Sequence, residues 1–237
     1  MDLIKELKKT GKPIVVVMLN GRGYSIPWLK EHADGIIEAW YPGEKGGDAI
    51  AKIIFGRVNP SGKLTVSFPV SAGQSPSNYN RKPSGHGFYY KPGSKEKPGR
   101  DYVFSSPGAL FPFGFGLSYT DFTFSNLKLS NTEFSSSDTL RLEVDVENTG
   151  AVKGKEVIQV YLNDLISSVT TPIKELKGFR KIELDRGEKK TVEIKIAVNS
   201  LSLINADMQE LVEAGEFEVM VGNSSEHILL REKILVN

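Results

Sequence analysis

Apolar and polar residues alternate strictly over several runs in the second half of the chain, and this alternation most restricts how the chain can fold. Residues 139–146 place four apolar side chains on one face of a strand: Leu140, Leu142, Val144 and Val146. The same period of two returns in 192–198 and 217–221, and polar turns such as ENTGAVKG and DRGE separate the runs. Such a period is typical of strands with one buried face. Residues 119–237 are therefore predicted to form an all-β sandwich of about seven short strands.

The first part of the chain has a different pattern. Residues 13–19 (PIVVVML) and 35–40 (GIIEAW) are continuous apolar runs, which indicate strands buried on both faces. Helical patterns follow around 28–32 and over 46–55, and a last short strand is predicted at 64–68. Strands that alternate with helices pair in parallel through crossovers. The prediction is a partial α/β parallel sheet with helices.

A long segment without a period separates these two parts. It is rich in Gly, Pro, Ser and aromatic residues, and a loop of this length is uncommon inside a compact domain. Its aromatic side chains can bury area against a neighbour, which argues against simple disorder. The predicted organisation is thus 1–69 as the α/β part, 70–118 as a linker and 119–237 as the sandwich.

Composition excludes several functions. The chain has no cysteine, so disulfides, thiolate chemistry and cysteine-based zinc sites are absent. The formal net charge of +1 gives no field for nucleic acid, and no apolar run is long enough to span a membrane. The three histidines show no ligand spacing, so we assign neither metal nor cofactor.

Several motifs resemble those of one enzyme family. The stretch EAWYPGEKGGDAIAKIIFGRVNPSGKLTVSFP, which begins at Glu38, resembles a signature of the α/β-sandwich domain of glycoside hydrolase family 3. LFPFGFGLSYTDFTFSNL resembles the linker that leads into that family's last domain. VDVENTGAVKGKEVIQVYLND and SSVTTPIKELKGFRKIELDRGEKKTVEIKI resemble its fibronectin type III-like domain, which has an immunoglobulin-like fold. The resemblance runs in order over nearly the whole chain.

This resemblance implies a β-glucosidase or β-xylosidase of which only the C-terminal piece is present. Members with this layout carry an N-terminal (β/α)₈ barrel that supplies the aspartate nucleophile, and the acid/base glutamate precedes the region matched here. Neither motif occurs in the chain, so we expect it to be inactive alone on its β-glycoside substrate. The resemblance also implies a periplasmic or secreted parent protein.

Few residues are candidates for a site. Glu44 and Asp48 follow the second predicted strand, where open α/β sheets bind ligands, but they also suit the N-terminal dipole of the next helix, which we favour. Side chains of the linker could line the edge of a sugar site: His86, Tyr89, Tyr90 and Arg100, with Tyr79, Arg81, Phe88 and Tyr102 near them. The simpler interpretation, also favoured, is that these aromatics pack the linker.

Three further expectations complete the interpretation. The alternative to a hydrolase piece is a non-catalytic module in which the sandwich binds carbohydrate or a protein partner. A cut α/β part would leave an unpaired sheet edge, so a homodimer through residues 1–69 is predicted. Within the sandwich, Tyr161 and Phe179 are assigned to the core.

Overall fold

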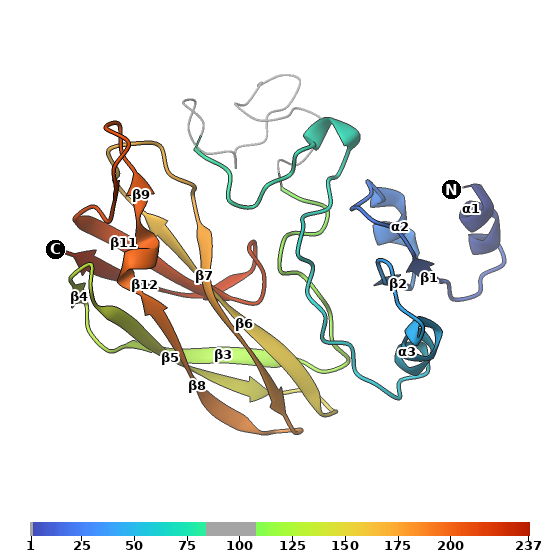
Figure 1. Ribbon diagram of the computed structural model, residues 1–237. Coiled ribbons are helices and arrows are strands. Elements are labelled where there is room, and N and C mark those ends of the chain that lie inside the picture. The colour runs from blue at the N-terminus through green and yellow to red at the C-terminus, as the bar shows by residue number, and fades with distance from the viewer. Residues whose placement is uncertain (1, 84–107) are drawn as a thin grey trace, which may run out of the picture. The chain divides into compact units, whose positions relative to one another are not determined.

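The computed structural model describes residues 2–83 and 108–237, which form two compact units (Figure 1). The first unit contains residues 2–58, 67–77 and 108–111. The second contains residues 112–237 together with the short segments 59–66 and 78–83. The chain therefore passes between the units several times before it enters the sandwich.

The first unit contains a small parallel sheet with helices. Its elements are α1 (Asp2–Lys8), β1 (Val15–Met18), α2 (Pro27–His32), β2 (Gly35–Glu38), α3 (Gly46–Ile54) and the short 3₁₀ helix η1 (Ala72–Gln74). β1 and β2 pair in parallel, and α2 lies in the crossover that a parallel pair requires. Gly11, which follows α1, has a φ of 72°, a conformation that glycine adopts without steric cost. The predicted strands at 13–19 and 35–40 and the helix at 46–55 are confirmed within two residues at each end.

The predicted strand at 64–68 does not form. The Leu64 N–H donates to the Phe115 carbonyl at 2.8 Å, and the Leu64 carbonyl accepts the Gly114 N–H at 2.7 Å. Phe68 makes an isolated antiparallel bridge with Phe111. The partners of this segment therefore lie about 45 residues later in the sequence rather than in β1 or β2, and a local apolar pattern cannot reveal such partners.

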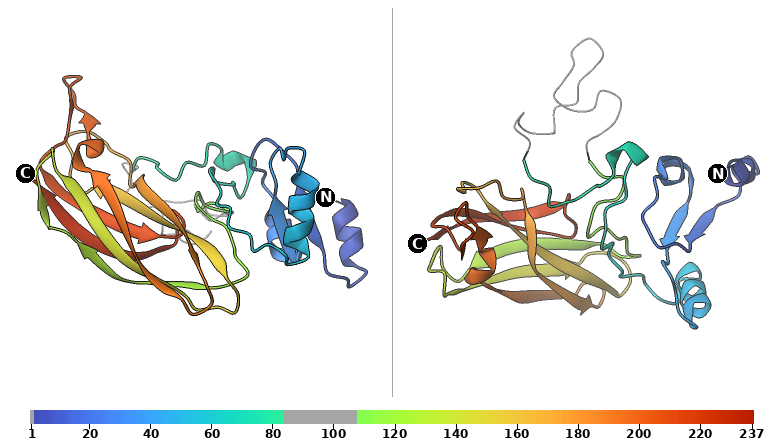
Figure 2. Two further views of the ribbon diagram at one scale, coloured as in Figure 1. Left: turned by 60° about the horizontal axis from the view of Figure 1, so that its bottom comes forward. Right: turned by 45° about the horizontal axis from the view of Figure 1, so that its top comes forward.

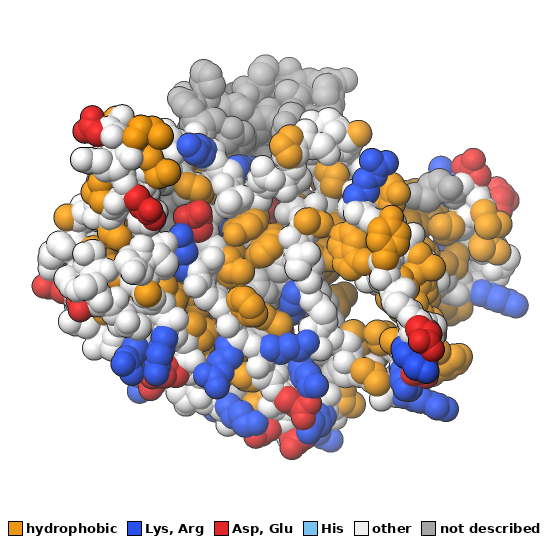
Figure 3. Space-filling model, viewed as in Figure 1, with side chains coloured by type: hydrophobic (Ala, Val, Ile, Leu, Met, Phe, Trp, Pro, Cys, Tyr) orange, Lys and Arg blue, Asp and Glu red, His pale blue; other side chains and the backbone are white. Residues whose placement is uncertain are grey.

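The first unit buries little apolar surface. Its buried large apolar side chains, among the described residues, are Ile26, Leu29, Phe68 and Leu110. β1 and β2 are half-buried instead of covered on both faces, and α1 buries no residue. In Figure 3, hydrophobic side chains gather on the surface of this unit. The prediction of fully buried strands was wrong because these described residues do not cover both faces of the sheet.

The second unit is a β-sandwich of two sheets, which Figure 2 shows as stacked layers. One sheet has the order β3 (Phe122–Leu129), β5 (Thr139–Asn148), β8 (Lys189–Ala197). The other has the order β4 (Glu133–Phe134), β12 (Ile228–Val236), β11 (Gly215–Gly222), β6 (Gly154–Asp164), β7 (Glu175–Leu184). Except for the parallel pair β12–β4, neighbouring strands are antiparallel. A 3₁₀ helix, η2 (Val198–Leu201), and a small ribbon of β9 (Leu203–Ile204) and β10 (Glu210–Leu211) complete the unit.

The core of the sandwich lies between the two sheets. The alternating residues of β5 are fully buried and meet the inward residues of the opposite sheet: Ile158, Val160, Val219 and Val221. Each such side chain contributes about 1.5–3 kcal/mol when it leaves water. The alternation at 139–146 therefore predicted both the strand and its buried face correctly.

The two aromatic side chains assigned to the core differ in their burial. Tyr161 is fully buried, as predicted, but the Phe179 side chain is 67% exposed, so its assignment to the core was wrong. A register shift in the β6–β7 pairing lies between Val160 and Tyr161. Gly178 occupies the position that faces the other sheet, where an added Cβ would lie 3.0 Å from Ile194 Cγ2. Phe179, the next residue, therefore points out of the sandwich.

The segment 59–66 is attached to the sandwich by polar contacts. Asn59 Oδ1 accepts hydrogen bonds from the Ser118 hydroxyl at 2.9 Å and the Tyr119 N–H at 2.8 Å, and its amide donates to the Lys153 carbonyl. Lys63 Nζ lies 2.8 Å from Glu156 Oε1, and these side chains are only 11% and 6% exposed. Asn59 and Lys63 therefore attach the segment 59–66 to residues at and just before the start of β6.

Candidate functional site

Glu44 and Asp48 do not form a paired site. Glu44 lies in the turn before α3, Asp48 lies in its first turn, and both are exposed. Asp48 Oδ2 accepts a hydrogen bond from Lys52 Nζ at 2.6 Å, one turn later on the same helix. This placement agrees with the interpretation that Asp48 complements the helix dipole and an i,i+4 cation. A role beside a sugar site stays a prediction for both residues.

The candidates in the linker fall largely outside the described residues. This holds for His86, Tyr89, Tyr90 and Arg100, and also for Phe88 and Tyr102. Tyr79 is described, and its ring stacks on Phe113 with centroids 4.2 Å apart and meets the edge of Tyr161. Its hydroxyl accepts the Leu176 N–H at 3.2 Å. Tyr79 therefore packs on the sandwich, as the simpler interpretation predicted.

A polar cluster that the sequence did not predict lies at the carboxyl ends of β1 and β2. The Asn20 amide donates to Glu38 Oε2 at 3.4 Å, and the Trp40 N–H donates to Oε1 at 3.1 Å. Burial raises the pKa of Glu38, although both hydrogen bonds oppose the shift. Buried Asn20 Oδ1 accepts no hydrogen bond from a described residue, and Trp40 has a φ of 51°. Asn20, directly after the predicted strand 13–19, was the available signal. The cluster offers one carboxyl group, whereas glycoside hydrolysis with retention needs two.

Asp164 and Glu213 are the carboxyl groups whose pKa values move in opposite directions within one neighbourhood. Burial raises the pKa of Asp164, helped by the charge of Glu213. Hydrogen bonds from Ser168 lower the pKa of Glu213. Opposite shifts are typical of acid/base pairs. Here, however, the Ser168 hydroxyl and N–H occupy both oxygens of Glu213. We interpret the hydrogen bonds between Ser168 and Glu213 as a link between two loops of the sandwich.

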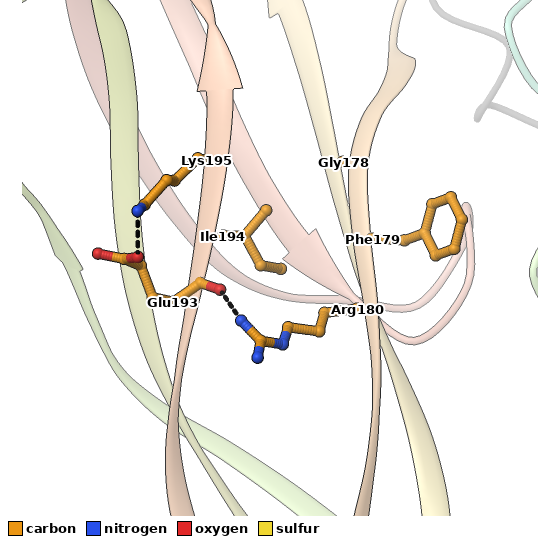
Figure 4. Close-up of a pocket in the computed structure, with 6 residues that line it drawn as sticks. All are labelled: Gly178, Phe179, Arg180, Glu193, Ile194 and Lys195. Atoms are coloured by element: carbon orange, nitrogen blue, oxygen red, sulfur yellow. Dashed lines mark hydrogen bonds and ion pairs between the residues drawn. The ribbon is translucent and has the colours of Figure 1, made fainter.

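A groove lies between β7 and β8, the edge strands of the two sheets. Its volume is about 340 Å³, and it is lined by Gly178, Phe179, Arg180, Glu193, Ile194 and Lys195 (Figure 4). The Arg180 guanidinium donates to the Glu193 carbonyl at 3.0 Å, and Lys195 pairs with the Glu193 carboxylate at 3.0 Å. With one carboxylate, already ion-paired, the groove lacks the groups for hydrolysis.

The described residues offer no obvious place for a metal. Across 2–83 and 108–237, no three or more His, Asp or Glu side chains gather as a metal site requires. None of the helices in those ranges has the length and apolar character needed to cross a membrane.

Two family models match the chain. The model of the glycosyl hydrolase family 3 C-terminal domain matches residues 1–119, and the model of the fibronectin type III-like domain matches residues 156–225. The first match covers half of the chain and contains both strands of the parallel sheet. The second covers most of β6 and all of β7, β8 and β11.

Curated relatives and solved structures agree with this assignment. A β-xylosidase of Formosa agariphila is 45% identical over 94% of this chain, and a periplasmic β-glucosidase of Salmonella typhimurium is 43% identical over 96%. The crystal structure of a β-glucosidase from Listeria innocua in complex with isofagomine superposes on 99% of the chain with a TM-score of 0.92 at 36% identity.

The chain spans only part of these proteins, namely 30% of the β-xylosidase, 29% of the periplasmic β-glucosidase and 32% of the solved β-glucosidase. The order of its two units, the motifs around Glu38 and the matches over nearly its full length lead to one assignment. The chain belongs to glycoside hydrolase family 3, whose C-terminal domain it carries together with a fibronectin type III-like domain.

Proposed function

We propose that this chain is the C-terminal, non-catalytic portion of a retaining β-glycosidase that acts on β-glucosides or β-xylosides, and that it hydrolyses neither alone. The observation that carries this proposal is the match to a C-terminal-domain model in a chain that spans about 30% of its relatives. Those relatives are named β-xylosidase and β-glucosidase.

The carboxyl groups of the described residues support the second half of the proposal. Retention requires a nucleophile and an acid/base group about 5–5.5 Å apart. The Glu38 carboxylate accepts a hydrogen bond from the Asn20 amide, and the Glu213 carboxylate accepts one from the Ser168 N–H. The Asp48 carboxylate is paired with Lys52. The groove between β7 and β8 holds one carboxylate, that of Glu193, and Lys195 is paired with it.

In the whole enzyme, this portion would form part of the wall beside the sugar site. Aromatic and cationic side chains of the linker suit the apolar face and hydroxyl groups of a sugar, which keeps His86, Tyr89, Tyr90 and Arg100 as candidates. Glu44 and Asp48 stay weaker candidates because both are exposed. The sandwich would stabilise the assembly.

An activity assay tests this proposal. Rigorously purified chain is incubated with p-nitrophenyl β-glucoside and β-xyloside, with the Formosa agariphila β-xylosidase as the positive control. We expect no release of nitrophenol above the uncatalysed rate, because loss of nucleophile and acid/base removes most of the rate enhancement. Turnover that disappears when one of the chain's own carboxylates is changed, for example in Glu38→Gln, would overturn the proposal.

A further inference from the structure

We propose that the polar cluster at the carboxyl ends of β1 and β2 is a docking point for a lysine or arginine side chain from the part of the parent enzyme that precedes this chain. The cluster consists of Asn20, Glu38 and Trp40. The inference rests on the proposed function, because it takes the chain as the C-terminal portion of a longer protein. It adds a residue of this chain that makes the contact and the charge of the group that it meets.

The Glu38 carboxylate lacks a counter-charge. It is half-buried, and the Asn20 amide at 3.4 Å and the Trp40 N–H at 3.1 Å, which donate to it, are both neutral. Across residues 2–83 and 108–237, no lysine, arginine or histidine forms an ion pair with it. Burial accordingly raises the pKa of Glu38. A carboxylate that leaves water without a cation costs free energy, which the cation of a partner would offset.

Asn20 adds a second acceptor without a donor. Its side chain is 8% exposed, and its Oδ1 accepts no hydrogen bond from a described residue. Most buried polar atoms of folded proteins have a hydrogen-bond partner, so the cluster is incomplete as it stands. Ammonium and guanidinium groups carry donors and no acceptor, and Glu38 is the group that an incoming side chain reaches first. A cationic side chain therefore fits the cluster, and an anionic one does not.

The surroundings of the cluster fit a protein partner. Leu19, next to Asn20, is 62% exposed, and Tyr41, next to Trp40, is 82% exposed. Tyr41 lies beside the turn that follows Asn20, because a Cβ added to Gly21 would be 2.7 Å from the Tyr41 hydroxyl. Exposed aromatic and aliphatic side chains around a polar group are typical of the surfaces with which proteins bind one another.

The preceding part of the parent enzyme is long enough to supply this partner. The chain spans 30% of the Formosa agariphila β-xylosidase and 29% of the Salmonella typhimurium β-glucosidase, and it matches the model of a C-terminal domain. More than two thirds of each relative therefore lies outside the matched portion. We assign the cation to that part of the parent rather than to a second copy of the chain, and the ligand to a side chain rather than to a sugar.

Glu38→Gln tests the contact, because its effect should differ between the chain alone and the whole enzyme. The variant keeps an oxygen for the Trp40 N–H and removes the charge. In the chain alone, both tryptophans lie in the first unit, and the melting temperature followed by their fluorescence should rise or stay unchanged. In a chimera of the Formosa agariphila β-xylosidase that carries this chain as its matching portion, the melting temperature should fall by about 2–4 °C, because the cation loses its counter-charge.

Glu31→Gln is the matched control, because Glu31 is exposed on α2 of the same unit and should leave both melting temperatures unchanged. Three results would overturn the inference: an unchanged chimera in Glu38→Gln, an equal fall in the chain alone, or equal falls for the two variants. Stabilisation of the chain by xylose that Glu38→Gln abolishes would assign the cluster to a sugar, and loss of a dimer in Glu38→Gln would assign it to a second copy. Either result would also overturn the inference. A wild-type chimera that does not hydrolyse its substrate would contradict the proposed function instead.

Discussion

Lys63 and Glu156 form the most buried ion pair among the described residues, and they join segments 93 positions apart. A buried pair contributes little relative to an apolar one, but removal of one partner leaves a buried charge that costs about 3–5 kcal/mol. The Lys63 ammonium also donates to the Gly116 carbonyl at 2.8 Å. This pair therefore ties the segment 59–66 to the sandwich.

Lys63→Met should lower the free energy of unfolding of the sandwich by about 3 kcal/mol, because Glu156 would lose its counter-charge. Urea unfolding measures the change. Lys233→Met is the control, since Lys233 and Glu216 form a pair that is 62% and 58% exposed and should contribute less than about 1 kcal/mol. Equal losses in the two variants would show that the Lys63 pair is not buried in solution.

Gly114 is required for two separate reasons. Its φ of 80° is unfavourable for other residues, and a Cβ there would overlap Gln159 Oε1. Gly114→Ala should therefore destabilise the sandwich by about 3 kcal/mol, the sum of backbone strain and overpacking. Gly187 has a φ of 72° but no atom within 4 Å of its added Cβ, so Gly187→Ala should cost only the strain, about 1 kcal/mol. Thermal unfolding distinguishes the two, and equal melting temperatures would contradict the packing argument.

Asp145 predicts how the sandwich responds to acid. Hydrogen bonds from Asn126, Thr191 and Lys189 lower the pKa of Asp145 far below its ordinary value of 3.8. A carboxyl with a lowered pKa in the folded state stabilises the protein above its unfolded pKa, and this stability is lost as the pH falls. Wild-type stability should therefore fall more steeply below about pH 4 than that of Asp145→Asn. Urea midpoints between neutral and acidic pH test this, and parallel curves for the two proteins would refute it.

At the scale of elements, the sequence predicted what depends on local periodicity. The alternation at 139–146 corresponds to β5, and the apolar runs at 13–19 and 35–40 correspond to the parallel pair β1 and β2. The segment 59–66 could not be predicted because its partners lie far away in sequence. Phe179 was misplaced because Gly178, which has no side chain, takes the inward position of β7 in line with Ile182 and Leu184, so the next residue lies on the outer face. The Asn20–Glu38 cluster was missed because it depends on how two strand ends meet.

The proposed domain boundaries near residues 69 and 118 can be tested with shortened chains. A chain of residues 119–237 should fold, since the core residues of the sandwich lie within it. It should be less stable than the sandwich of the full chain by about 3 kcal/mol, because Glu156 stays buried without Lys63. Circular dichroism with urea unfolding measures both properties. An unfolded 119–237 chain would place the boundary earlier than we propose.

At the scale of the whole molecule, the first unit exposes apolar surface. Large apolar side chains are exposed on and after α3 and around β1: Val15, Leu19, Ile54, Phe55 and Val58. Exposed apolar surface next to a short parallel sheet favours association with another chain. We therefore propose a homodimer through residues 1–69 for the isolated chain.

Size-exclusion chromatography with light scattering tests the dimer. We expect twice the mass of the chain, and the change Phe55→Asp should shift the protein toward the monomer because it places a charge in the apolar surface. Phe179→Asp, an exposed phenylalanine of the sandwich, is the matched control and should leave the dimer intact. A wild-type chain that stays monomeric at high concentration would exclude this association.

The central claim is that the chain is the non-catalytic C-terminal portion of a family 3 β-glycosidase. The most direct measurement is the rate of p-nitrophenyl β-xyloside hydrolysis by the Formosa agariphila β-xylosidase after its matching portion is replaced by this chain. The chain and that enzyme align over 228 residues at 45% identity, which makes the exchange feasible. We predict that the chimera hydrolyses the substrate and that the chain alone does not. Hydrolysis by the chain alone, or a folded chimera without activity, would contradict the claim.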